Sequence, residues 1–62
     1  MGLKAVHCVE LSKHAVVTGY HYIAVEWAEM ALKLVENGDI SVDLQSVKEA
    51  ITAAFAAVSI FT

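Results

Sequence analysis

One helix-stop signal divides this chain. The tripeptide Asn37–Asp39 follows a run rich in Ala, Leu, Glu and Lys, with Lys33 in the last turn and Gly38 just beyond the end. This is the pattern of a helix C-terminus. Asn-Gly is also favoured in tight β-hairpins, but residues 28–34 show no alternation of period two. We therefore predict a turn over residues 37–42 between two helices.

Upstream of the turn, polar side chains recur at helical spacing. The stripe runs through Glu26, Glu29, Lys33 and Glu36 and continues back, without a phase slip, to Lys4. Opposite it lies an apolar seam of Val6, Val9, Val16, Tyr20, Ile23, Trp27, Met30 and Leu34. This periodicity predicts one helix over about residues 3–36. A bend is allowed near Gly19, because glycine costs about 1 kcal/mol in a helix interior. A strand over residues 5–11 is the alternative, but polar and apolar residues are mixed on both of its faces.

Downstream of the turn, a second helix is predicted over about residues 43–61. Ser41 or Asp43 can cap its N-terminus. Its apolar residues step by three and four, as in a heptad repeat, and Phe55 lies beside them. The core or interface residues expected here are Leu44, Val47, Ile51, Phe55 and Val58.

The lengths of these two helices predict self-association. The first would be about 50 Å long and the second under about 30 Å, so an αα-hairpin would leave Val6, Val9, Leu11 and Val16 facing water. The chain has 62 residues, of which 58% are hydrophobic, and a domain below about 70 residues seldom has a sufficient core of its own. We therefore expect an all-α, single-domain fold that is completed by homodimerisation into four helices.

Charge and side-chain chemistry narrow the function classes. Four basic and seven acidic residues give a formal charge of −3, which makes nucleic acid an improbable partner. The single cysteine, Cys8, excludes an intramolecular disulfide. No matched acid, base and nucleophile indicates catalysis. We expect no enzymatic activity and no cofactor.

Three histidines, His7, His14 and His21, are spaced by seven residues and share one helical face. Neighbours in this series lie about 10 Å apart along a helix, so no metal site is expected. His7, Glu10 and His14 would be the candidates if the protein instead responded to metal or pH. The favoured interpretation is a mildly acidic partner-binding face made of His7, Glu10, His14, His21, Tyr22, Glu26 and Glu29.

Targeting signals are not expected either. The N-terminus lacks a basic run followed by an apolar core. The uncharged stretch over residues 50–62 is shorter than the roughly 20 apolar residues that span a bilayer. We expect a cytoplasmic protein that binds itself and an unknown protein partner, without entering a membrane.

The stretch from Leu11 to Asp39, LSKHAVVTGYHYIAVEWAEMALKLVENGD, resembles the small early proteins encoded between the exo and xis genes of lambdoid bacteriophages. The similarity rests on the strings KHAVVTGYHY and EWAEMALKL, which make up under half of the chain. The resemblance implies a small helical protein, made early in infection in the host cytoplasm, that biases development and host physiology toward lytic growth. That family offers no catalytic residues to carry over.

Overall fold

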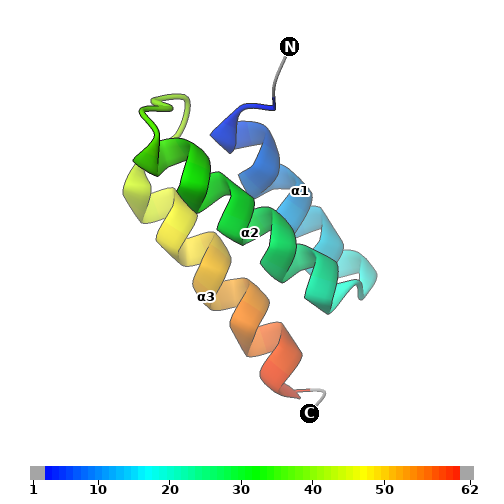
Figure 1. Cartoon of the computed structure of the whole chain (residues 1–62). Helices are drawn as coiled ribbons and strands as arrows, with labels where there is room; N and C mark the ends of the chain where they lie inside the picture. The colour runs from blue at the N-terminus through cyan, green and yellow to red at the C-terminus, as the bar shows by residue number, and fades with distance from the viewer. Residues whose placement is uncertain (1–2, 61–62) are drawn as a thin grey trace.

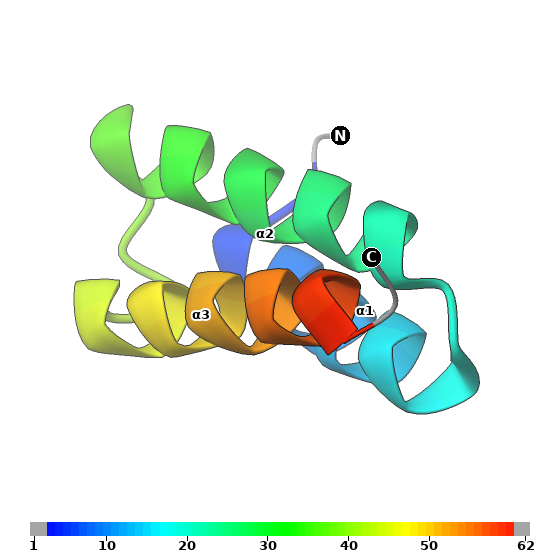
Figure 2. The ribbon, with the colours of Figure 1, turned by 90° about the horizontal axis from the view of Figure 1, so that it is seen from below.

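The computed structural model describes residues 3–60, which form three helices: α1 (Ala5–Thr18), α2 (His21–Glu36) and α3 (Leu44–Ile60). Each helix runs back along the previous one, so α1 and α3 point the same way (Figure 1). In the perpendicular view, α2 lies above α1 and α3 and runs alongside them (Figure 2). Over the described residues there is no strand, so the all-α class is confirmed and the strand alternative over residues 5–11 is wrong.

The predicted single helix over residues 3–36 is wrong, because the chain reverses at Gly19. Gly19 has a left-handed backbone with φ of 93°. Its N–H donates to the carbonyl of Val16, and the N–H of Tyr20 donates to the carbonyl of Ala15 over 2.8 Å. This pair of bonds is the Schellman motif, which satisfies the last carbonyls of a helix and ends it. Gly19 is therefore a helix terminator and not a bend.

The same motif ends α2 at the predicted stop signal. Gly38 has φ of 103°, and its N–H donates to the carbonyl of Val35, while the N–H of Asp39 donates to that of Leu34 over 2.9 Å. The next helix begins at Leu44. Asp43 caps this helix, because its carboxylate accepts a hydrogen bond from the N–H of Ser46. Asp43 is one of the two residues predicted as its N-cap.

The loop between α2 and α3 also caps α1. Lys4 provides no side-chain cap. Instead, the carboxylate of Asp39 accepts the N–H of Ala5 over 2.9 Å, and the hydroxyl of Ser41 accepts the N–H of Val6 over 3.1 Å. Ser41 in turn donates its own N–H and O–H to Asp39. Two free donors at the start of α1 are thus satisfied by residues more than thirty positions away.

The core of the bundle consists mainly of alanine. Its fully or nearly buried side chains include Ala5, Cys8, Ser12, Ala15, Ala24, Ala28, Ala31, Val47, Ala50, Ala54 and Ala57. Small side chains allow the three helices to approach closely, and every pair of helices is in contact. Of the apolar residues expected in the core or interface, Val9 and Val47 are buried, and Val6, Val16, Trp27, Leu34, Ile51 and Val58 are half-buried.

The premise behind the predicted four-helix dimer is therefore corrected. Residues 5–18 do not project from a hairpin as an uncovered arm, since they fold back on α2 and α3 as α1. Val9 is consequently buried, and Leu11 keeps only 37% of its surface exposed. A second copy can bury only the side chains that the closed three-helix unit leaves exposed.

Candidate protein interface

Large apolar side chains lie on the outside of the bundle. Tyr20, Ile23 and Met30 keep 62%, 46% and 45% of their surface exposed. Together with the half-buried Trp27 and Leu34, Ile23 and Met30 follow one side of α2 at steps of three and four residues, and Tyr20 precedes them as the N-cap residue of this helix. We call these five residues the α2 seam. The distribution of sizes is inverted relative to an ordinary domain, in which large apolar side chains fill the core.

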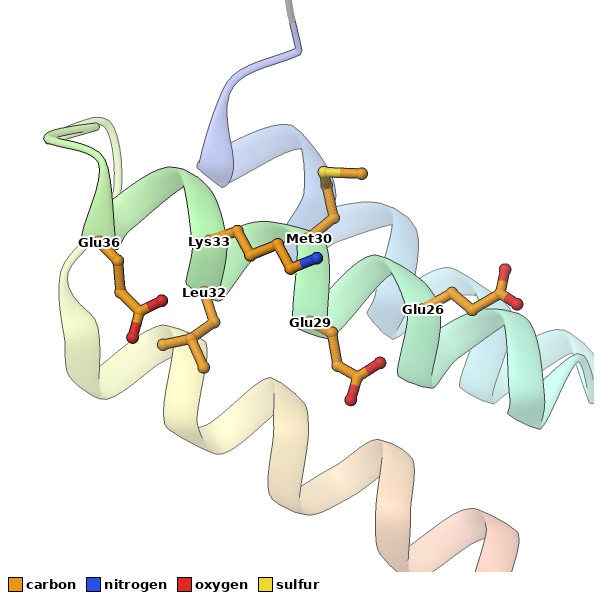
Figure 3. Close-up of a pocket in the computed structure, with 6 residues that line it drawn as sticks. All are labelled: Glu26, Glu29, Met30, Leu32, Lys33 and Glu36. Atoms are coloured by element: carbon orange, nitrogen blue, oxygen red, sulfur yellow. The ribbon is translucent and has the colours of Figure 1, made fainter.

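Charged residues border the α2 seam on the outer surface of α2. A shallow hollow there is lined by Glu26, Glu29, Met30, Leu32, Lys33 and Glu36. Figure 3 shows Met30 pointing toward the side of α1, whereas Leu32 and Glu29 point toward α3. One lysine thus lies among three glutamates. Two residues of the predicted partner-binding face, Glu26 and Glu29, lie in this hollow.

The register of α1 against α2 is fixed by a buried hydrogen bond. The hydroxyl of Ser12, which is 1% exposed, donates to the carbonyl of Ala24 over 2.8 Å. Because the two helices are antiparallel, Leu11 lies beside the stretch of α2 that carries Ile23 and Trp27. Sequence reasoning missed Ser12, which is the sole polar residue of the buried core among residues 3–60.

The predicted histidine face is split between two helices. His7, Glu10 and His14 are exposed and lie together with Leu11 along one hollow on α1. His21 is half-buried beside Tyr22 at the start of α2, in a separate hollow near the α1–α2 turn. Tyr22, Glu26 and Glu29 are exposed on α2. Within residues 3–60 no three His, Cys, Asp or Glu side chains converge closely enough to hold a metal ion.

Cys8 is fully buried against the alanine core. Burial raises the pKa of its thiol, and the negative charge of Asp39 raises it further. Since the thiolate is the reactive form of cysteine, the fold holds Cys8 in its unreactive state. Its surroundings are those of a small core residue, as is usual for a free cysteine.

A second apolar edge follows α3. Leu44 and Phe55 keep 45% and 49% of their surface exposed, and Ile60 keeps 78%. Ile51 and Val58 lie between them and are half-buried. The C-terminal half of α3 has no charged residue. The seam predicted for this helix is therefore only partly used inside one chain.

No family model matches this chain, and no curated protein or solved structure is significantly similar to it. None of the helices between residues 3 and 60 is long and apolar enough to cross a membrane.

Proposed function

We propose that this chain is a small, non-enzymatic interaction protein that works as a homodimer. The observation that supports the proposal is the inverted distribution of apolar side chains. Alanine fills the core, while Tyr20, Ile23, Met30 and Phe55 each keep 45% or more of their surface in water. Large apolar patches that remain exposed on a folded chain are typical of surfaces that bind another protein.

A second copy is the partner we favour for these side chains. Burying one large apolar side chain contributes about 1.5–3 kcal/mol, and a core made mostly of alanine offers little of that within one chain. A symmetric dimer would use the same surface on both copies. Homodimerisation thus supplies the burial that the folded unit lacks.

The remaining exposed residues suit a further protein partner. Glu10 on α1, between His7 and His14, and Glu29 and Glu36 on α2 are exposed acidic groups on a chain with a formal charge of −3. An acidic face favours basic partners through long-range attraction. In keeping with the resemblance to early phage proteins, we propose that the dimer regulates a host or phage protein by binding it.

Sedimentation velocity on the full chain tests the proposal. We expect a species of twice the 6.7 kDa chain mass at tens of micromolar. Ile23→Ser should shift the protein toward the monomer, whereas Ala53→Ser, at an exposed site on α3, should not. A wild-type chain that sediments as a monomer over this concentration range would refute the homodimer.

A further inference from the structure

The spacing and the bordering charges of the α2 seam specify how a second copy fits. The inference rests on the homodimer proposed above and adds the surface, the direction and the register. We propose that α2 of one copy packs antiparallel against α2 of the second copy, with the two seams in contact and Glu26 of each copy beside Lys33 of the other.

The spacing of the seam is that of a helix-pairing surface. Tyr20, Ile23, Trp27, Met30 and Leu34 are separated by three, four, three and four residues. A repeat averaging 3.5 residues keeps a seam facing a partner helix and lets its side chains enter the gaps of the facing seam. Within the chain, α1 and α3 contact α2 through its alanine face at Ala24, Ala28 and Ala31. Trp27 and Leu34 also pack against this core with part of their surface, whereas Tyr20, Ile23 and Met30 keep 45% or more of theirs exposed.

The charges beside the seam select the antiparallel direction. In heptad terms Glu26 and Lys33 occupy the same bordering position, one heptad apart, while the other bordering position holds Ala24 and Ala31. In a parallel pair each charged border would face the side of the other α2 on which Ala24 and Ala31 are buried, so no ion pair would form between the two helices. In an antiparallel pair like borders meet, and Glu26 of each copy can face Lys33 of the other.

The same charges select one register. When Trp27 packs beside Met30 of the second copy, and Ile23 beside Leu34 of the second copy, two-fold symmetry repeats each contact and gives four apolar layers. Glu26 and Lys33 then meet twice as opposite charges. Sliding the helices by one heptad places Glu26 against its own copy, and like charges in contact oppose binding.

The size of a stable interface requires more than α2. A standard interface buries about 800 Å² on each partner, which is about a fifth of the 4263 Å² surface of this chain. The contact must therefore extend onto the neighbouring side of α1, where Leu11, His7 and His14 lie in one hollow. This places the predicted histidine face at the margin of the dimer.

Charge reversal tests the register. Glu26→Lys and Lys33→Glu should each weaken dimerisation about tenfold, because each reversal replaces two attractive contacts by two repulsive ones. The double variant Glu26→Lys/Lys33→Glu should return to within about threefold of the wild type. Glu29→Lys is the matched control, because it changes the net charge by the same amount as Glu26→Lys. The side chain of Glu29 points toward α3 (Figure 3), so this variant should not weaken the dimer.

The dissociation constants are measured by sedimentation equilibrium at low and high salt, with far-UV circular dichroism to confirm that each variant is folded. Charge effects of this kind should shrink at high salt. A wild-type dimer that is indifferent to both single reversals, or a double variant as weak as the singles, overturns this register and leaves the homodimer standing. A wild-type monomer overturns both proposals.

Discussion

Replacing Gly19 by alanine should change the free energy of unfolding in one direction if the chain reverses at this residue and in the opposite direction if the helix is continuous. Gly19 has φ of 93°, and the space beside its Cα is open to a distance of 4 Å, so an added methyl group meets no atom. The cost is then that of the backbone alone, about 1–2 kcal/mol for an L-residue held in the left-handed region. In a continuous helix the same substitution would stabilise the protein by about 1 kcal/mol.

Guanidinium unfolding followed by circular dichroism measures the difference. Wild type and variant are compared at one chain concentration, because the stability of a dimer depends on it. Gly38→Ala calibrates the loss, since Gly38 has φ of 103° and equally open surroundings. A Gly19→Ala variant more stable than the wild type, beside a destabilised Gly38→Ala, would refute the chain reversal at residue 19.

Three further outcomes follow from the same geometry. Ala28→Leu should destabilise the bundle by about 1–3 kcal/mol in thermal or guanidinium unfolding, because the core has no room, whereas Ala53→Leu at an exposed site should change it little. Hydrogen bonds from Ser41, and then from Ala5, lower the pKa of Asp39. The stability that this shift provides should be complete above the unfolded pKa of about 4 and should be lost as the pH falls through the folded pKa. Asp39→Asn should therefore reduce the loss of unfolding free energy at acid pH. Cys8, with its raised pKa, should react with a thiol reagent at neutral pH only as the protein unfolds, and fast labelling of the native state would contradict its burial.

The helix-stop at Asn37-Gly38 could be predicted because a helix and a glycine-ended turn leave a local signature. Gly38 forms the Schellman bonds expected of it, and Asp43 caps the next helix. The tertiary cap on α1 could not be predicted, since it joins Asp39 to Ala5 across the fold. Nothing near Ala5 in the sequence indicates that its donor is satisfied from so far away.

The reversal at Gly19 escaped the periodicity for a physical reason. Both α1 and α2 expose one polar face, and the turn between them preserved the phase of that stripe. A polar stripe indicates which residues are exposed to solvent. The same residues can be exposed in one straight helix and in two helices that form a hairpin. The sequence signal for the turn is Gly19 itself, which follows the β-branched run from Val16 to Thr18. Glycine just past a helix end is typical of a Schellman motif.

The sequence pattern predicts which large apolar residues lie together, but not which of them are buried. The spacing of Tyr20, Ile23, Trp27, Met30 and Leu34 groups them in one seam; the last four lie on α2 and Tyr20 is the N-cap residue of that helix. Large apolar residues were expected inside, but Ala24, Ala28 and Ala31 take that place. Hydrophobicity alone predicts that isoleucine is buried in preference to alanine. It does not take into account that three closely packed helices need small side chains at their contacts. Whether a second copy covers the seam stays a prediction.

Isotope-filtered nuclear Overhauser spectroscopy tests that prediction most directly. Equal amounts of labelled and unlabelled chains are unfolded together and refolded, so that contacts between copies are separated from contacts within one chain. We predict intermolecular cross-peaks from the Met30 methyl group to the Trp27 ring, and from Ile23 to Leu34. A mixed sample without cross-peaks between copies, or with cross-peaks confined to α3, would contradict it.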